Sequence, residues 1–377
     1  MNIELQQIGL AAAALAVALI VALVTTPVVM NLAHRVGAMD IPKDNRRMHD
    51  HPIPRMGGLA IALGFLLSAL LFVPITEQMR GMLLGSIIIL VLGIFDDIYS
   101  LKAWFKFIVQ IVAAVVAVAT GSIIDCVSNP NIFSANLYWE LGWLAYPVTV
   151  IWIVAITNAV NLIDGLDGLA CGVSTISSMT LLVIALLVSE GPTAVLMGAL
   201  AGGCIGFLPY NLNPAKIFMG DTGSTFLGFM LGTVSVIGLF KLYAMISFIV
   251  PFIILGFPIF DTVSAFTRRI LKGQNPMKAD RSHTHHKLID MGMNQKQAVA
   301  TLYMVAGVLG LCAVMIVSSG YVKVILSVAA LIATACTAAR IARYPHNHHP
   351  AEGAKPNAGG GEKTDGTPPE APGEGKE

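Results

Sequence analysis

The sequence predicts an all-α, polytopic integral membrane protein with about eleven transmembrane helices. Of the 377 residues, 55% are hydrophobic and only 12% are charged, whereas a typical soluble domain has about 25% charged residues. The mean hydropathy is +0.75. Uncharged runs recur along the chain, and the alternating pattern of a membrane β-barrel is absent from them.

Eleven such runs account for the predicted helices. A bilayer core needs about 20 apolar residues per helix, and lipid offers backbone polar groups no partner, so each run is expected to be helical. Two of them, 81–95 and 324–339, are short and need flanking residues to complete a span. In chain order the runs are 5–30, 57–76, 81–95, 107–124, 141–161, 169–189, 191–208, 222–240, 242–260, 297–322 and 324–339.

The charges between the runs predict the orientation. With eleven spans, one side of the membrane receives 20 of the 23 Lys and Arg residues. The positive-inside rule places that side in the cytoplasm, with the N-terminus outside and the C-terminus inside. The first run has no basic segment before it and no small-residue cleavage site, so we expect it to remain as a helix.

This threading also predicts the domain organisation. A transmembrane catalytic domain covers 1–344, and 345–377, rich in Gly, Pro, Glu and Lys, is expected to be a disordered cytoplasmic tail. On the outer side, 125–140 is long enough for a small hairpin or an interfacial aromatic anchor. The five cysteines show neither metal-site nor disulfide spacing. The predicted cytoplasmic loops are 33–55, 96–106, 161–167, 209–221 and 268–296.

Two adjacent carboxylates, Asp96 and Asp97, stand at the inner end of the third run. Such a pair repels itself beside a membrane unless a cation or a basic group neutralises it. Lys102 and Lys106 follow closely. The pair is therefore a candidate functional site, and the alternative is an ordinary charged helix end.

Oxygen-bearing side chains recur every third residue at Asn158, Asn161, Asp164 and Asp167. Residues three apart share one helical face, so the spacing predicts a polar stripe. A glycine follows each aspartate and leaves room for a ligand or for another backbone segment. Mg²⁺ prefers oxygen ligands of this kind, together with substrate phosphates. The alternative is the capping of a helix end.

Asp221 is expected at the N-terminus of the eighth helix, where the free N–H groups attract anions. It either caps that helix or carries a metal that faces a phosphate. Gly220 and Gly223 resemble a phosphate-cradling turn, although the sequence is not a Walker A motif. Phe218 is a candidate for stacking on a base or for ordinary packing.

Asp261 lies at the inner end of the ninth, otherwise apolar run, where a carboxylate is a functional hypothesis by default. Its expected partner is Arg268 or Arg269, and the alternative role is a structural ion pair. The loop that follows is basic and contains three histidines within four residues. It suits a pyrophosphate or lipid headgroups better than zinc. The first loop is similarly basic, and Gly57 and Gly58 leave room for a close ligand.

Five motifs together resemble the polyprenyl-phosphate N-acetylhexosamine-1-phosphate transferases. They are RRMHDHPIPRMGG, GIFDDIYSLKAWFK, NAVNLIDGLDGLA, NLNPAKIFMGDTGS and DRSHTHHKL, in this order between about residues 33 and 296. The HxHH pattern is similar to that of the bacterial UDP-GlcNAc:undecaprenyl-phosphate GlcNAc-1-phosphate transferases, which initiate O-antigen, enterobacterial common antigen or teichoic-acid synthesis. The related muramoyl-pentapeptide translocases typically have ten spans and three consecutive histidines, which Thr284 interrupts here.

The resemblance implies transfer of GlcNAc-1-phosphate from UDP-GlcNAc to undecaprenyl phosphate at the bacterial inner membrane, with release of UMP. It implies Mg²⁺, or Mn²⁺ in its place, contact with membrane lipids, no nucleic-acid partner, and a homodimer as an option. The implied catalytic residues are Asp96, Asp97, Asp164 and Asp167, and the implied metal ligands are Asp221 and Asn161. The implied substrate-binding residues are Lys106, Asn211, Lys216, Phe218, Arg281, His283, His285, His286, His49 and Arg55.

Within that set, Asp96 is expected to orient or deprotonate the lipid phosphate, which Asp97 and Lys106 position. The alternative mechanism makes a carboxylate the covalent nucleophile, and the sequence does not separate it from direct attack by the lipid phosphate. Asp164 and Asp167 are expected to bind or orient the nucleotide sugar. Phe218 would stack on uracil, and the histidines with Arg281 would hold the diphosphate or the sugar.

An ion-coupled secondary transporter is the alternative from another class. Transporters place ionisable groups near the membrane midplane, often within inverted repeats, whereas the acidic residues here lie at one predicted face. The transferase hypothesis requires the separate polar motifs to converge in one crevice.

Overall fold

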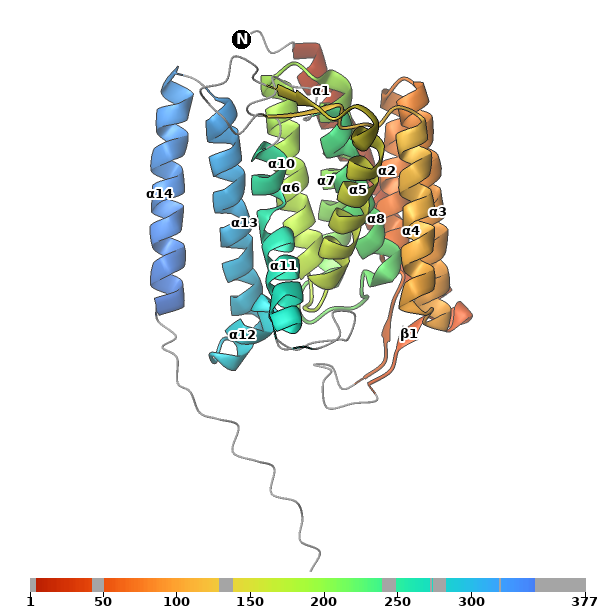
Figure 1. The fold of residues 1–377 in the computed structure, drawn as a ribbon. Coiled ribbons are helices and arrows are strands. Elements are labelled where there is room, and N and C mark those ends of the chain that lie inside the picture. The colour runs from red at the N-terminus through yellow and green to blue at the C-terminus, as the bar shows by residue number, and fades with distance from the viewer. Residues whose placement is uncertain are drawn as a thin grey trace, which may run out of the picture. The chain divides into compact units, whose positions relative to one another are not determined.

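The protein is a bundle of α-helices with two small hairpins, seen here in a computed structural model that describes residues 5–42, 51–128, 138–238, 249–271, 273, 283–318 and 320–342. Most of the helices run side by side, and short α12 lies across one end of the bundle (Figure 1). The helices are α1 Leu5–Val36, α2 Gly58–Phe72, α3 Glu77–Tyr99, α4 Ala103–Ala119, α5 Ala145–Leu162, α6 Leu169–Leu187, α7 Gly191–Asn211, α8 Gly220–Gly238, α10 Ile249–Ile254, α11 Gly256–Leu271, α12 Thr284–Asp290, α13 Gln295–Val317 and α14 Gly320–Ala342.

The hairpins lie at opposite ends of the bundle. At the end of α12, β1 (Met39–Asp40) pairs antiparallel with β2 (Ile53–Pro54). At the other end β3 (Cys126–Ser128) pairs with β4 (Tyr138–Glu140), which confirms the small hairpin expected in 125–140.

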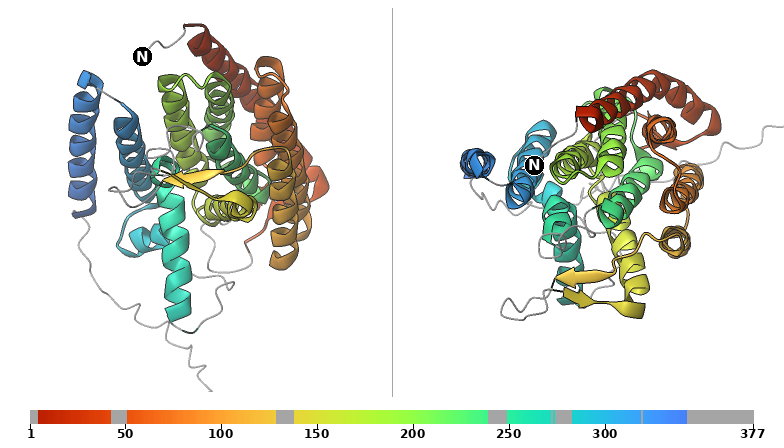
Figure 2. Two further views of the ribbon diagram at one scale, coloured as in Figure 1. Left: turned by 45° about the horizontal axis from the view of Figure 1, so that its top comes forward. Right: turned by 90° about the horizontal axis from the view of Figure 1, so that it is seen from above.

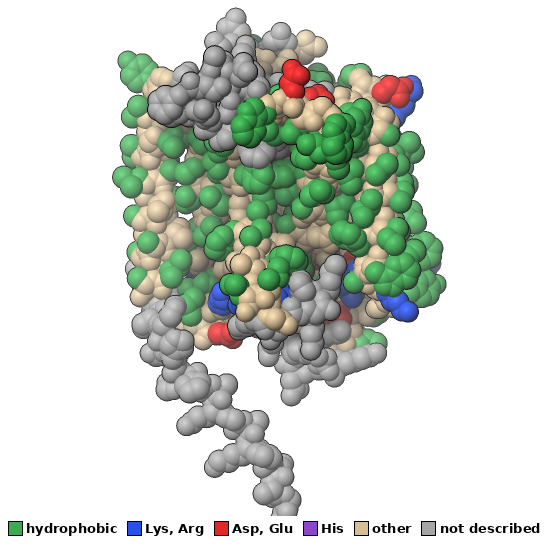
Figure 3. Space-filling view, in the orientation of Figure 1, with side chains coloured by type: hydrophobic (Ala, Val, Ile, Leu, Met, Phe, Trp, Pro, Cys, Tyr) green, Lys and Arg blue, Asp and Glu red, His purple; other side chains and the backbone are tan. Residues whose placement is uncertain are grey.

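Each uncharged run of the sequence contains at least part of a helix. Among the described residues, seven helices are long and apolar enough to cross a membrane, and α2 and α4 are shorter apolar helices. Hydrophobic side chains cover the middle of the face seen in Figure 3, and charged side chains lie near its two ends. These observations confirm an all-α membrane protein in outline. The predicted tail 345–377 lies outside the described residues.

Small residues allow the closest helix packing. Ala11 and Ala18 of α1 are almost fully buried, Ala11 against Gly198 of α7 and Ala18 against Gly64 of α2. A side chain at Gly198 of α7 would come within 2.7 Å of the Ala11 carbonyl oxygen. Small residues of this kind are the usual means by which helices approach each other in a membrane.

The helix α8 is the buried centre of the site-bearing half of the bundle. Nearly every residue of α8 is enclosed, and α8 packs against α3 and α5. In contrast, α14 packs on α13 at the margin of the bundle, as the view from above shows (Figure 2). The site residues on α8 are therefore held on a rigid element.

The ninth run, 242–260, was predicted as part of one helix that continues to Arg268 and Arg269, and the prediction of a single unbroken helix was wrong. The helix breaks at Leu255 between α10 and α11, and α11 continues to Leu271. Gly256 and Pro258 stand in the first turn of α11, where proline's missing N–H costs no hydrogen bond. The break creates an amphipathic helix whose inner face carries Asp261.

Candidate active site

Four helix ends bring their polar side chains together around Asp221, in the first turn of α8. The Lys106 Nζ of α4 lies 2.8 Å from Asp96 Oδ2 of α3 and 2.6 Å from Asp221 Oδ2. The Asn161 Nδ2 of α5 lies 3.3 Å from Asp221 Oδ1. The convergence that the transferase hypothesis requires is therefore present for these four residues.

Asp97 holds the start of α8 from the neighbouring helix. Its Oδ1 accepts the Asp221 N–H at 2.9 Å, and its Oδ2 accepts the Thr222 N–H at 3.0 Å and the Thr222 hydroxyl at 2.6 Å. Its side chain is fully buried, and Arg55 Nε lies 3.4 Å from Oδ1. In this arrangement Asp97 acts on α8, and its expected contact with a lipid phosphate stays a prediction.

Asp96 is also engaged within the protein. Its Oδ1 accepts the Leu101 N–H at 2.7 Å, which fixes the turn between α3 and α4, while its Oδ2 faces Lys106. The turn therefore places the Lys106 ammonium beside the carboxylates of Asp96 and Asp221.

Glycines make this approach possible. A side chain at Gly93 of α3 would come within 2.7 Å of the Thr222 nitrogen, and one at Gly220 within 2.7 Å of Asp97 Oδ1. A side chain at Gly58 would collide with the backbone at Gly223. A side chain at Gly57 would likewise meet the Phe207 ring, and one at Gly223 the Met219 side chain, so these glycines allow close packing within the protein. The expected approach of a ligand or phosphate to the glycines at 57, 58, 220 and 223 stays a prediction. Sequence reasoning missed Gly93, although it lies four residues before Asp97 and so on the same helical face.

The first loop is joined to the segment before α8 by main-chain hydrogen bonds. The Phe218 N–H donates to the Pro54 carbonyl at 2.8 Å, and the Gly57 N–H donates to the Phe218 carbonyl at 3.0 Å. This pairing places the guanidinium of Arg55 near the carboxylates, with Nη2 3.8 Å from Asp221 Oδ1. Arg55 thus lies beside Asp97 and Asp221, and its expected substrate-binding role stays a prediction.

The predicted polar stripe does not continue beyond Asn161. Because α5 ends at Leu162, Asp164 and Asp167 lie in the turn before α6 and not on the helical face of Asn161. Asn158 belongs to a separate pair, with its Nδ2 2.6 Å from Gln110 Oε1 of α4. The prediction of four groups on one helical face was therefore wrong.

The two aspartates of the turn have different surroundings. Burial and the nearby charge of Asp221 raise the pKa of Asp164 to about 8. Asp167 Oδ2 instead accepts the Asn213 amide at 2.9 Å and the Ala215 N–H at 3.1 Å. Asp167 therefore ties this turn to the segment that leads to α8.

The other predicted site residues in the segment before α8 differ in how exposed their side chains are. Asn211 is buried and its Nδ2 donates to the Ile217 carbonyl at 3.0 Å. Lys216 is exposed and Phe218 is half-buried, so both present surface beside the site. Their substrate-binding roles stay predictions.

The histidines pack against the turn between α5 and α6. A side chain at Gly165 would come within 2.9 Å of His285 Cε1. Burial, followed by the charge of His286, lowers the pKa of His285 to about 4. The ring of His286 lies 4.3 Å from that of His285, centroid to centroid. His49 and Arg281, also expected in the site, lie outside the described residues.

Asp261 does not pair with Arg268 or Arg269 as predicted. Its partners among the described residues are His283 and Thr284, with His283 Nδ1 2.8 Å from Asp261 Oδ2. The prediction failed because it considered only neighbours on the same helix.

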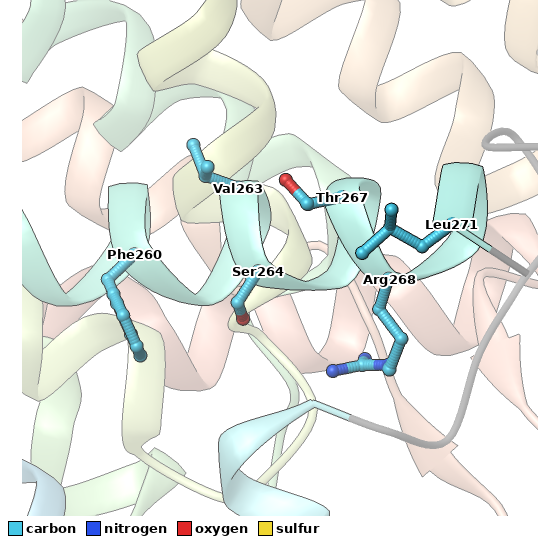
Figure 4. A pocket seen from close by; sticks show the side chains of 6 residues that line it. All are labelled: Phe260, Val263, Ser264, Thr267, Arg268 and Leu271. Atoms are coloured by element: carbon cyan, nitrogen blue, oxygen red, sulfur yellow. The ribbon is translucent and has the colours of Figure 1, made fainter.

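The outward face of α11 carries an open groove of about 490 Å³ (Figure 4). No groove was predicted there, although the lining residues recur at helical spacing in the sequence. Apolar side chains dominate it, with two hydroxyls and one arginine. The lining residues are Phe260, Val263, Ser264, Thr267, Arg268 and Leu271.

The residues around Asp221 fit Mg²⁺. Among the described residues, no group of three or more His, Cys, Asp or Glu side chains is arranged to hold a metal. Mg²⁺, however, is usually bound by one or two carboxylates, with water and substrate phosphates completing the shell. Asp96, Asp221, Asn161 and Ser224 supply hard oxygen donors of this kind, and Asn161 Nδ2 lies 2.8 Å from Ser224 Oγ.

Comparison with known proteins identifies a family and several named relatives. The family model described as glycosyl transferase family 4 matches residues 79–239. A Bacillus subtilis protein named as a probable undecaprenyl-phosphate N-acetylglucosaminyl 1-phosphate transferase is 45% identical over 306 residues, covering 80% of this chain and 84% of the relative. A decaprenyl-phosphate N-acetylglucosaminephosphotransferase of Mycolicibacterium smegmatis is 33% identical, covering 89% and 88%. A phospho-N-acetylmuramoyl-pentapeptide-transferase of Desulforudis audaxviator is 32% identical, covering 78% and 95%.

Proposed function

The chain belongs to the polyprenyl-phosphate N-acetylhexosamine-1-phosphate transferase family, and from that premise we propose that it transfers GlcNAc-1-phosphate from UDP-GlcNAc to undecaprenyl phosphate. The products are undecaprenyl-pyrophosphoryl-GlcNAc and UMP. The observation that carries the proposal is the position of Lys106, whose ammonium bridges Asp96 and Asp221 where α3, α4 and α8 meet.

The reaction joins two anions, so the protein must neutralise and align them. A phosphate oxygen of the lipid attacks the sugar-linked phosphorus, a new P–O bond forms, and the bond to UMP breaks. A phosphate monoester has a second pKa of about 6, so little proton removal is needed at neutral pH. Fixed charges such as Lys106 and Arg55 are then most useful for orientation and for stabilising the charge of the transition state.

We propose that Asp221 and Asn161 hold Mg²⁺, with Mn²⁺ able to replace it. The ion would offset the charge of the pyrophosphate and of the leaving UMP. Asp97 holds the backbone of Asp221 in place, because its carboxylate accepts the first N–H groups of α8. Asp96 and Lys106 then face the lipid phosphate.

The nucleotide sugar is assigned to the turn 163–168, the segment before α8 and the histidines. The half-buried ring of Phe218 would stack on uracil. Asp164, with its pKa raised to about 8, would be largely protonated at neutral pH and could donate a hydrogen bond to the sugar or phosphate. His285 packs over Gly165 in the same turn.

The polyprenyl chain of the acceptor needs an apolar surface that opens to lipid. The groove on α11 offers one, with Phe260 68% exposed and Leu271 81% exposed at its two ends. Arg268 in the same groove would attract the phosphate end of the lipid. We assign the chain to this face of α11.

We propose eleven spans, with the N-terminus outside and the C-terminus inside. The excess of Lys and Arg on one side supports this orientation. It puts the site on the cytoplasmic side of the bacterial inner membrane, where UDP-GlcNAc is available. The product would then initiate a cell-surface polymer of the O-antigen or teichoic-acid type. A homodimer is proposed on family likeness alone.

Purified protein tests the function directly. With undecaprenyl phosphate, UDP-GlcNAc and Mg²⁺ it should release UMP, and a panel of UDP-sugars should show preference for GlcNAc. The panel includes UDP-N-acetylmuramoyl-pentapeptide, the donor expected for the alternative type of transferase. Failure to release UMP with every UDP-N-acetylhexosamine would refute the proposal.

A further inference from the structure

Asp261 is a buried carboxylate whose two oxygens both bind the segment that begins α12. Its side chain is 1% exposed. His283 Nδ1 lies 2.8 Å from Oδ2, while the Thr284 N–H and hydroxyl reach Oδ1 at 2.7 and 2.6 Å. These contacts join residues 22 and 23 positions apart in the chain.

The contact fixes the first residue of α12. The opening N–H groups of a helix have no partner within the helix, and a carboxylate is well suited to bind them. Here the carboxylate comes from α11, and α12 has no side-chain cap of its own at His283. The position of α12 therefore depends on α11.

The same contact fixes the ring of His283. An ionised carboxylate only accepts hydrogen bonds, so the proton between the two groups belongs to Nδ1 of His283. The other ring nitrogen, Nε2, is then an acceptor when the histidine is neutral and a donor when it is charged. Asp261 thus sets both the ring's orientation and its tautomer.

The effect passes on to His285. The rings of His283 and His285 are stacked, with centroids 5.7 Å apart and planes 10° from parallel. His285 is 2% exposed and lies against Gly165, next to Asp164. A contiguous set of contacts therefore runs from Asp261 through His283 to the turn that faces the nucleotide sugar.

We propose that Asp261 is a positioning residue for the donor side of the site, acting through His283 and Thr284 to hold the histidine segment against the turn 163–168. The inference rests on the proposed function for its effect on the reaction. The contact between Asp261 and the histidine segment does not depend on that function, because it would shield the histidines from chemical modification whatever reaction the protein catalyses.

Two measurements on the full-length protein test the proposal. The first is the rate at which diethyl pyrocarbonate modifies His283 and His285, read for each residue by mass spectrometry. The second is the KM for UDP-GlcNAc and the KM for undecaprenyl phosphate, measured from UMP release. The variants are Asp261→Ala and the isosteric Asp261→Asn, with melting temperature as the check on folding.

We expect Asp261→Ala to increase modification of both histidines by roughly 10-fold or more, and both variants to raise the donor KM by about 10- to 100-fold, the size of effect known for loss of the hydrogen-bond partner of a metal-ligating histidine. The acceptor KM should change far less. Thr284→Val should show the same pattern more weakly, because it removes only the hydroxyl that binds Asp261. Thr284→Ser keeps a hydroxyl and should therefore give values close to those of the wild-type protein.

Asp290 offers a matched control, since it is an exposed aspartate at the end of the same helix α12. Asp290→Asn should alter neither histidine protection nor either KM. Unchanged protection in Asp261→Ala would overturn the proposal, as would equal rises of the two KM values in folded Asp261→Asn. If the wild-type protein released no UMP, the proposed function would fail, yet the protection experiment would still decide whether Asp261 holds the histidines.

Discussion

Lys106 of α4 and Asp221 of α8 are 115 positions apart in the chain, yet the ammonium nitrogen lies 2.6 Å from a carboxylate oxygen. A second carboxylate, Asp96, lies 2.8 Å from the same nitrogen. Without the Lys106 ammonium, the carboxylates of Asp96 and Asp221 would face each other with no cation between them. The pair therefore sets the charge balance on which two anionic substrates depend.

Replacing Lys106 with Gln should lower kcat/KM for UMP release by roughly 100-fold, the loss typical when one group that stabilises transition-state charge is removed. Lys106→Arg, which keeps the charge, is the control and should lose less. Equal losses in the two variants would show that the charge is not what matters.

Asp221→Asn should lower turnover by on the order of 10²- to 10³-fold and weaken the dependence on Mg²⁺. Its melting temperature should stay close to wild type, because the Asp97 contacts to the start of α8 use the backbone of residue 221. Titration with Mg²⁺ checks the prediction, and a variant with normal turnover would remove Asp221 from the metal site.

Asp97→Ala should lower both activity and stability. It removes a fully buried acceptor of three hydrogen bonds and leaves Arg55 without this partner. Loss of one member of a buried ion pair typically costs about 3 to 5 kcal/mol. Thermal unfolding in detergent should therefore separate Asp97→Ala from Asp221→Asn, and similar melting temperatures for the two would contradict the capping role.

Gly93→Ala should disturb the site through packing, since the added carbon would come within 2.7 Å of the Thr222 nitrogen. We expect a lower melting temperature and a large loss of UMP release. Gly307→Ala is the matched control, because a carbon added at Gly307 of α13 would meet nothing within 4 Å. That variant should be as stable as wild type or gain about 0.5 to 1 kcal/mol, as alanine favours helices over glycine.

The stability of the protein should fall in acid partly because of His285. Burial lowers the pKa of this group from 6.5 to about 4. Between these values the unfolded chain binds a proton that the folded protein does not, so unfolding becomes easier as the pH falls. His285→Gln should show a shallower loss of melting temperature between pH 6.5 and 4. Parallel curves for the two proteins would contradict this assignment.

The sequence was a good guide to the helices because long apolar runs can be satisfied in lipid only as helices. It was a poorer guide to where helices stop. Asp164 and Asp167 continued the spacing of Asn161, but the backbone leaves the helix at Leu162. The glycines in this segment carried the signal, since they disfavour a continuous helix.

The partners of the charged groups were also hard to predict. The gathering of Asp96, Asn161 and Asp221 followed from their common place at one predicted face, and the structure brings them together. In contrast, the partner of Asp261 comes from a later loop, and the capping of α8 by Asp97 comes from another helix. No local spacing reveals such contacts, because they depend on how the helices are packed.

The enclosure of α8 separates the reacting centre from the surrounding bilayer. Asp221 stands on a helix that other helices enclose over nearly its whole length, whereas α14 packs on α13 at the margin of the bundle. Changes in membrane thickness or fluidity would therefore act first on that periphery, and the spacing between the Asp221 carboxylate and its neighbours would be preserved.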